Sequence, residues 1–196
     1  MIAILDYGSG NLRSAQRAFE LTGHKVVITS DSKTFLGADA FVVPGVGAFG
    51  ACMKQLEDVG GASLVKEAVA TTKPLFGICV GMQILFSQGE EKGSHSGIGF
   101  FQGSVAKLAA PVLPHIGWNT IDTNCATFEG LKDQMFYFVH SYAVKTAPAD
   151  AQITWTTYGE RFVAAVERNN IFGTQFHPEK SGDAGAKLIS NWAARI

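Results

Sequence analysis

The sequence predicts an α/β protein whose open, mostly parallel sheet is flanked by helices and gains antiparallel strands in its second half. In the first half, continuous apolar runs at residues 2–5 and 25–29 enclose a helical periodicity at residues 12–21. Continuous apolar strands are typical of parallel sheets that are covered on both faces. Residues 97–176 are mostly short β-like segments between turn residues, and a helical pattern returns over residues 183–194.

Length and composition predict a single domain over residues 1–196, because 46% of the residues are hydrophobic and only 17% are charged. The net charge is −1 without blocks of like charge, which argues against nucleic-acid and membrane partners and favours small molecules or proteins. The amino terminus shows neither a signal peptide nor a membrane-spanning run. The cysteine count is odd and includes no CxxC pair, so a reduced, cytoplasmic protein is expected.

A glycine-rich loop, Pro44–Gly50, follows the predicted strand Ala40–Val43, which Pro44 is expected to end. Open α/β sheets place their ligands at this carboxyl end of the strands. One helix is predicted to follow, from about residue 51 to residue 72. Neither this loop nor Gly8-Ser9-Gly10 completes the G-x-G-x-x-G pattern, so no dinucleotide is expected.

The segment around Cys79 has the Gly-x-nucleophile-x-Gly pattern of a strand-to-helix elbow, with cysteine in place of serine. An apolar strand, Leu75–Ile78, leads into it, and a helix-like run follows over Met82–Phe86. Gly77 and Gly81 leave room for a tight turn. The sulfur is then expected at a helix N-terminus, which favours a thiolate. The alternative is a buried structural cysteine in a glycine-containing turn.

Four of the five histidines have no carboxylate that the sequence places beside them. His24 follows a predicted turn and His95 lies in the polar segment 90–97, so both are expected to be solvated and without a catalytic role. His115 and His140 lie in more structured segments, but no carboxylate occurs within a few residues of either.

His177 differs, because Glu179 follows it by two residues at the end of an apolar strand. Side chains two apart on extended backbone point to the same side, and Pro178 restricts His177 to an extended conformation. Glu179 is therefore expected to orient the imidazole and stabilise its charged form. A surface His-Pro-Glu turn is the alternative, but the elbow favours a Cys79–His177–Glu179 triad. No HExxH pattern accompanies His177, so no metal site is expected.

Together, Gly77-Ile-Cys-Val-Gly-Met-Gln83 and Gln175-Phe-His-Pro-Glu179 resemble the class I, triad-type glutamine amidotransferases. Further segments resemble the glutaminase subunits of imidazole glycerol phosphate synthases, and they extend over nearly the whole chain. These segments are Asp6–Ser14, Pro44–Phe49, His115–Asn119, Phe138–Tyr142 and Phe176–Ser181. Val80 departs from the leucine that is more frequent in the family, which matters little for a residue that offers its backbone N–H.

The resemblance implies a flavodoxin-like core and hydrolysis of L-glutamine to L-glutamate and ammonia through a cysteine thioester, without a cofactor. It also implies a heterodimer with a (β/α)8-barrel cyclase subunit. That subunit uses the ammonia to make imidazole glycerol phosphate and aminoimidazole carboxamide ribotide in histidine biosynthesis. Ammonia released into water is protonated and diluted, so a sealed interface is expected. The residues that the resemblance assigns to this interface are Asn11, Trp118, Asn119 and Lys180.

The residues around the nucleophile predict the remaining roles. Val80 N–H is expected as one donor to the oxyanion, by analogy with the residue after an elbow serine. Gly47 N–H is expected as the second donor, although a plain strand-to-helix turn is the alternative for that loop. Gln83 lies one helical turn after Cys79 and is expected to bind the α-amino or α-carboxylate end of glutamine. The resemblance adds Ser141 and Tyr142 at that end, through backbone groups.

Three alternatives stay open. Another amidotransferase glutaminase, such as that of pyridoxal phosphate synthesis, should lack the DYGSGN and HIGWN segments that are present here. A peptidase or chaperone-like member of the same superfamily has no need of the His-Pro-Glu segment. A noncatalytic module that regulates a partner has no need of an intact triad. A glutaminase assay with and without the partner distinguishes these possibilities.

Overall fold

The computed structural model describes residues 1–146 and 148–196, and a seven-stranded sheet in the order β11-β12-β13-β4-β3-β1-β2 forms its centre. The parallel strands are β1 (Ile2–Leu5), β2 (Val26–Thr29), β3 (Ala40–Gly45), β4 (Leu75–Cys79) and β13 (Ile171–Thr174). Strands β12 (Glu160–Arg168) and β11 (Gln152–Tyr158) extend the sheet in antiparallel orientation. The predicted α/β class, a mostly parallel sheet with antiparallel additions, is confirmed.

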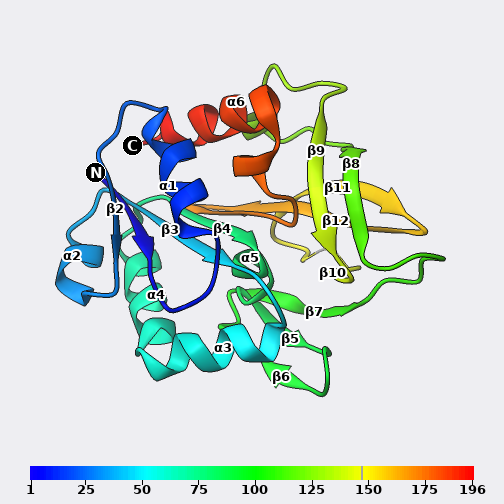
Figure 1. Cartoon of the computed structure of the whole chain (residues 1–196), viewed down its shortest axis with the longest axis horizontal. Coiled ribbons are helices and arrows are strands. Elements are labelled where there is room, and N and C mark those ends of the chain that lie inside the picture. Colours follow the sequence, from blue (N-terminus) through cyan, green and yellow to red (C-terminus); the bar gives the residue numbers. More distant parts are fainter. Residues whose placement is uncertain (147) are drawn as a thin grey trace.

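Helices cover both faces of the parallel strands (Figure 1). Helices α1 (Leu12–Glu20) and α6 (Gly182–Ala193) lie on one face, and α3 (Phe49–Asp58) and α4 (Gly61–Ala70) lie on the other. The short α2 (Ser32–Leu36) connects β2 to β3. Phe19 of α1 and Trp192 of α6 meet Phe76 of β4 with ring centroids 5.7 and 5.4 Å apart. This coverage explains why residues of β1, β3 and β4 are apolar without alternation.

Two smaller sheets lie beside the carboxyl ends of the parallel strands. The first contains β5 (Phe86–Gly89), β6 (His95–Ser96), β7 (Phe101–Lys107) and β10 (Tyr142–Val144). The second is the antiparallel pair β8 (His115–Thr120) and β9 (Met135–His140). Single 3-10 turns occur at η1 (Ala126–Phe128) and η2 (Pro178–Lys180). In Figure 1 these sheets stand at the right of the view, away from both chain ends.

Three sequence expectations about elements were wrong. Strand β3 does not end at Pro44 but runs to Gly45, because β1 pairs with β3 only as far as Val42, and proline is tolerated on an unpaired strand edge. The single helix expected over residues 51–72 is α3 and α4, separated where Gly60 adopts a left-handed φ of 68°. The apolar run after Cys79 is only one helical turn, α5 (Val80–Gln83), and residues from Phe86 pair in β5. Short apolar runs fit a helix and a strand equally well.

Within the described residues, the structure contains no helix that is both long and apolar enough to cross a membrane.

Candidate active site

Cys79 is the last residue of β4 and is only 4% exposed. Its backbone has φ 56° and ψ −113°, a conformation that non-glycine residues rarely adopt and that is characteristic of strained functional positions. Gly81 is required for a different reason: a Cβ built there lies 1.9 Å from the carbonyl oxygen of Val43 in β3. The elbow therefore combines a cysteine in a strained backbone conformation with a close backbone approach at Gly81.

Replacing Gly81 by alanine is expected to destabilise the protein by about 3 kcal/mol or more, because β3 cannot move away from the elbow without losing its sheet pairing. Urea unfolding measures the loss. The control is Gly23→Ala: its added Cβ meets no atom within 4 Å, and it has only the left-handed φ of 82° to strain it, which costs about 1–2 kcal/mol. Equal destabilisation by the two substitutions would contradict the packing argument.

His177 and Glu179 form a buried pair directly after β13. Nδ1 of His177 donates to Oε1 of Glu179 at 2.8 Å, and both side chains are about 3% exposed. The backbone of His177 donates to the carbonyl of Tyr137 at 2.9 Å and accepts from the Ser181 hydroxyl at 2.7 Å. His177 is extended, as Pro178 predicts, but Glu179 lies in the 3-10 turn η2. The contact is thus made across a turn, not along an extended strand as expected.

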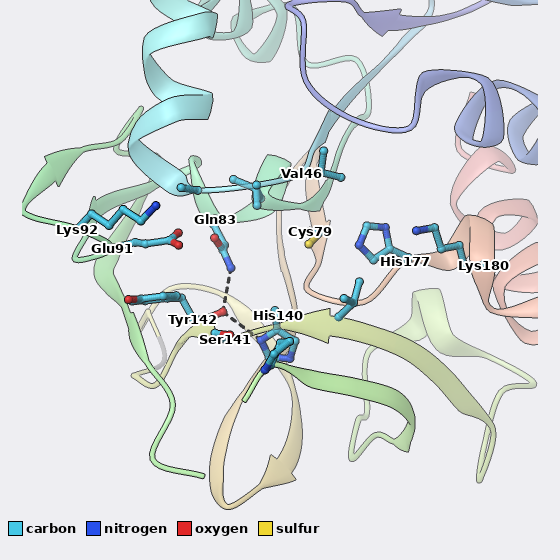
Figure 2. A pocket seen from close by; sticks show the side chains of 15 residues that line it. Val46, Cys79, Gln83, Glu91, Lys92, His140, Ser141, Tyr142, His177 and Lys180 are labelled. Atoms are coloured by element: carbon cyan, nitrogen blue, oxygen red, sulfur yellow. Dashed lines mark hydrogen bonds between the residues drawn. The ribbon is translucent and has the colours of Figure 1, made fainter. Parts of the chain in front are cut away.

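The surroundings of His177 make it a cation at neutral pH. Burial lowers the pKa of His177, but hydrogen bonds and charges from Cys79 and Glu179 outweigh burial and raise the pKa to about 10. In Figure 2 the sulfur of Cys79 faces the His177 ring. Because α5 has only four residues, its dipole is weaker than the sequence suggested.

The loop after β3 lies beside Cys79, because Gly45 and Cys79 are partners in the β3–β4 register. Val46 N–H donates to the Ser9 hydroxyl at 3.1 Å, and the Val46 carbonyl accepts from the Cys52 thiol at 3.1 Å. The C=O and N–H of a trans peptide point in opposite directions. Gly47 N–H, on the same peptide as the Val46 carbonyl, therefore points away from Ser9 and Cys52.

A cavity of about 410 Å³ opens at Cys79, a volume typical of small-molecule sites (Figure 2). It brings together most of the residues that the sequence singled out for catalysis and substrate binding. These lining residues are Gly47, Cys79, Val80, Gln83, Ser141, Tyr142 and His177. Glu179 lies behind His177 and does not line this cavity.

The amide of Gln83 has a fixed orientation. Its Nε2 donates to the Tyr142 carbonyl at 3.0 Å and to Oε1 of Gln175 at 2.9 Å. Nε2 of Gln175 in turn lies 3.7 Å from the Cys79 sulfur. Since an amide nitrogen has two protons, both protons of Gln83 are used, and its Oε1 is the atom left to accept a hydrogen bond.

The carbonyls of Ser141 and Tyr142 are already engaged within the protein. The Ser141 carbonyl accepts from Leu108 N–H at 3.0 Å. The Tyr142 carbonyl accepts from Gln83 and also from Nδ1 of His140, at 3.0 Å each. The structure thus uses the Tyr142 carbonyl to hold Gln83.

Sequence reasoning missed three cavity residues that have titratable side chains: Glu91, Lys92 and His140. Glu91 and Lys92 fall in the segment that was interpreted as a polar surface loop, and no local pattern links them to Cys79. His95 of that segment is also not a loop residue; it is half-buried in β6 and packs against Gly50. A signal was available for His140, since it directly precedes Ser141 and Tyr142 in the chain, but a neighbouring carboxylate was taken as the mark of a functional histidine.

The residues assigned to a partner interface lie on different parts of the surface near the cavity. Trp118 is 52% exposed on β8, in edge contact with Tyr137 of β9. Asn11 is exposed and caps α1 by accepting from Ser14 N–H at 3.3 Å. Lys180 is exposed at the cavity. Asn119 is only half-exposed, and its amide donates to the Thr157 carbonyl at 3.0 Å, so it ties β8 to β11.

Among residues 1–146 and 148–196, no three His, Cys, Asp or Glu side chains are grouped so that they could hold a metal ion.

Comparison with known proteins decides the family. The family model of class-I glutamine amidotransferases matches residues 3–196. The chain belongs to the class-I glutamine amidotransferases. This amidotransferase is 52% identical to the imidazole glycerol phosphate synthase subunit HisH of Corynebacterium glutamicum, over 97% of this chain and 96% of that protein. It is 51% identical to the same subunit of Thermobifida fusca, over 100% and 98% of the two chains.

The fold of this amidotransferase is shared with solved structures. A crystal structure of a glutamine amidotransferase superposes with a TM-score of 0.78 at 18% identity and covers 98% of both chains. The resemblance that the sequence motifs predicted is therefore confirmed. The chain is a glutamine amidotransferase subunit, and hence an enzyme, of the imidazole glycerol phosphate synthase type.

Proposed function

We propose that this amidotransferase hydrolyses L-glutamine through a thioester on Cys79 and passes the ammonia to a cyclase subunit that makes imidazole glycerol phosphate in histidine biosynthesis. The observation that carries the proposal is the cavity in which Cys79, the charged His177 and the oriented amide of Gln83 meet. The names of the similar proteins, which are synthase subunits, support the pathway and the partner.

In the first step the Cys79 thiolate attacks the side-chain amide carbon of glutamine and forms a tetrahedral intermediate. Gly47 N–H, directed away from Ser9, and Val80 N–H, in the first turn of α5, are the proposed donors to its oxygen. Removing one such donor typically lowers the rate by about 10²–10³-fold. The carbon–nitrogen bond then breaks, and the imidazolium of His177 gives its proton to the departing ammonia.

In the second step neutral His177 takes a proton from water, and the resulting hydroxide equivalent attacks the thioester carbon. The carbon–sulfur bond breaks, glutamate leaves, and the thiolate and imidazolium are restored. Glu179 stabilises the positive charge each time it returns to His177, through the 2.8 Å hydrogen bond to Nδ1.

Charges at the far end of the cavity match the α-substituents of an amino acid. The free Oε1 of Gln83 and the Glu91 carboxylate are proposed to accept from the α-ammonium group, and the Lys92 ammonium is proposed to pair with the α-carboxylate. Figure 2 places Glu91 and Lys92 on the side of Gln83 that is remote from His177. Gln83 is therefore assigned to the ammonium end, because an acceptor cannot bind a carboxylate.

The outer face of the β8–β9 pair is the proposed contact surface for the cyclase subunit. Alternation in the two strands buries His115, Phe136, Phe138 and His140 and directs Ile116, Trp118 and Met135 outward, each more than half exposed. Exposed apolar side chains grouped on one strand pair are typical of protein interfaces. Lys180 and Asn11 are proposed at the rim.

Trp118→Ala is expected to weaken association with the cyclase subunit about 30-fold or more, as for a central aromatic anchor. Isothermal calorimetry measures the dissociation constant. Leu21→Ala, which removes a side chain that is 79% exposed at the end of α1, serves as the control and should leave the affinity unchanged. An unchanged affinity of the Trp118→Ala variant for the cyclase would contradict the proposal that this face of β8 contacts the cyclase.

The decisive experiment is a glutaminase assay of the purified chain with and without the cyclase subunit and its ligand. Hydrolysis of L-glutamine that increases with the cyclase is expected. Absence of hydrolysis in both conditions would contradict the proposed activity, and a rate that does not depend on the cyclase would contradict the proposed partner.

A further inference from the structure

Two buried histidines lie beside the substrate end of the cavity, which His140 helps to line, and none of the proposed steps uses them. His115 of β8 and His140 of β9 face each other in the strand register and are 3% and 7% exposed. Nδ1 of His115 lies 3.1 Å from Nε2 of His140. Nδ1 of His140 lies 3.0 Å from the Tyr142 carbonyl oxygen. The three groups thus form a continuous chain of hydrogen bonds.

The Tyr142 carbonyl, at the end of these hydrogen bonds, determines which ring nitrogens of His140 and His115 carry a proton. A carbonyl oxygen only accepts, so Nδ1 of His140 carries a proton and donates. In a neutral imidazole the other nitrogen is then a bare acceptor, and Nδ1 of His115 must donate to Nε2 of His140. The ring of His115 is held by stacking on Tyr158, with centroids 4.0 Å apart. One arrangement of protons therefore satisfies the whole chain.

Burial keeps both rings neutral, as this arrangement requires. It lowers the pKa of His115, and it lowers the pKa of His140 to about 3. The neighbouring His115 and the charged His177 act on His140 in the same direction.

The Tyr142 carbonyl connects the pair to the substrate. His140 and Gln83 both donate to this one oxygen, and Figure 2 shows the two hydrogen bonds converging on it. The hydrogen bond from His140 fixes the direction of the Tyr142 carbonyl. That direction determines where Nε2 of Gln83 must lie. The remaining Oε1 of Gln83 then faces the cavity.

We propose that His115 and His140 are positioning residues: they hold the Tyr142 carbonyl, and through it the Gln83 amide, in the orientation that accepts the α-ammonium group of the substrate. This inference rests on the proposed glutaminase function. His140 acts through Tyr142 and Gln83, so its loss should weaken substrate binding and leave the chemical step at Cys79 largely intact.

Asparagine and glutamine side chains each imitate one nitrogen of a histidine ring, so His140→Asn and His140→Gln provide a matched pair of variants. Asn in place of His140 presents an N–H near the Nδ1 position and can still donate to the Tyr142 carbonyl. Gln presents its amide near the Nε2 position and cannot. We expect His140→Gln to raise the KM for L-glutamine about 3- to 10-fold, the effect of one ordinary hydrogen bond. The KM of His140→Asn should stay within about twofold of the original value. The kcat of both variants should also stay within about twofold of the original.

Both variants are assayed in the complex with the cyclase, beside His24→Asn and His24→Gln as controls outside the cavity. Equal increases in KM for the Asn and Gln variants of His140 would indicate packing alone and would overturn the proposal. So would an unchanged KM in both, or a loss confined to kcat. Thermal melting of each variant verifies that it is folded at the assay temperature.

A second measurement does not depend on glutamine hydrolysis. ¹⁵N NMR of the histidine-labelled chain should show His115 and His140 as neutral rings protonated at Nδ1. A proton on Nε2 of His140 would overturn the proposal whatever the enzyme does. If the original chain shows these tautomers but no hydrolysis of L-glutamine with the cyclase, the proposed function fails, while the hydrogen-bonded pair stands.

Discussion

Replacing Cys79 by alanine is expected to lower glutamine hydrolysis by about 10⁴-fold or more, because no other group can form the thioester. The fold should persist, since Cys79 lies at the end of β4 and a methyl group fits the space of the thiol. Steady-state assays with the cyclase and circular dichroism measure the two effects. Retained glutamine hydrolysis in the Cys79→Ala variant would show that Cys79 is not the nucleophile.

Cys125 provides the matched control for this prediction. Its thiol is buried and donates to Oε2 of Glu167 at 2.7 Å, away from the cavity. Cys125→Ala should therefore keep glutaminase activity. Iodoacetamide tests the same point in the original chain: alkylation is expected at Cys79, whose sulfur opens on the cavity beside a charged imidazole. Mass spectrometry that locates the label on Cys52 or Cys125 instead would contradict the assignment.

Replacing Glu179 by glutamine is expected to lower kcat/KM by about 10²–10⁴-fold, because the buried imidazolium loses its counter-charge while the shape of the side chain is kept. Glu179 contributes to raising the pKa of His177 to about 10. Removal of the carboxylate lowers that pKa, so His177 loses its proton at a lower pH.

The pH dependence of kcat/KM for L-glutamine hydrolysis measures this shift, because the proposed acylation step needs a protonated His177 to give its proton to the departing ammonia. The fall in kcat/KM at alkaline pH should begin near pH 10 in the original chain and at a lower pH in Glu179→Gln. Glu129→Gln, a change at an exposed carboxylate, is the control and should leave the profile unchanged. A profile for Glu179→Gln that matches the original would show that Glu179 does not charge His177.

Much of the fold was predictable from the sequence because its signals are local. The strands near residues 2–5 and 26–29 and the helix at 12–20 follow from apolar runs and helical spacing within a few residues. The contact between His177 and Glu179 was also predictable, since the two residues are only two positions apart in the chain. The errors at Pro44 and after Cys79 arose where the outcome depends on which strand lies alongside, information that a short segment does not contain.

The parts of the site that sequence reasoning missed are those that depend on distant contacts. Glu91 reaches the cavity from the segment between β5 and β6, and its carboxylate accepts from Phe49 N–H of α3 at 3.2 Å. His115 and His140 meet only because β8 and β9 pair, 25 residues apart in the chain. The direction of the Gln83 amide depends on Gln175, 92 residues away. Spacing alone cannot indicate such contacts.

The position of β13 has a consequence for how the enzyme is made. This strand lies between β12 and β4 and is followed at once by Gln175 and His177, the groups that approach the Cys79 sulfur. A ribosome releases the chain from its amino terminus. A growing chain therefore exposes the elbow cysteine long before His177 has been synthesised. In the proposed mechanism, the thiol becomes a reactive nucleophile only after β13 has inserted into the sheet and placed His177 beside Cys79.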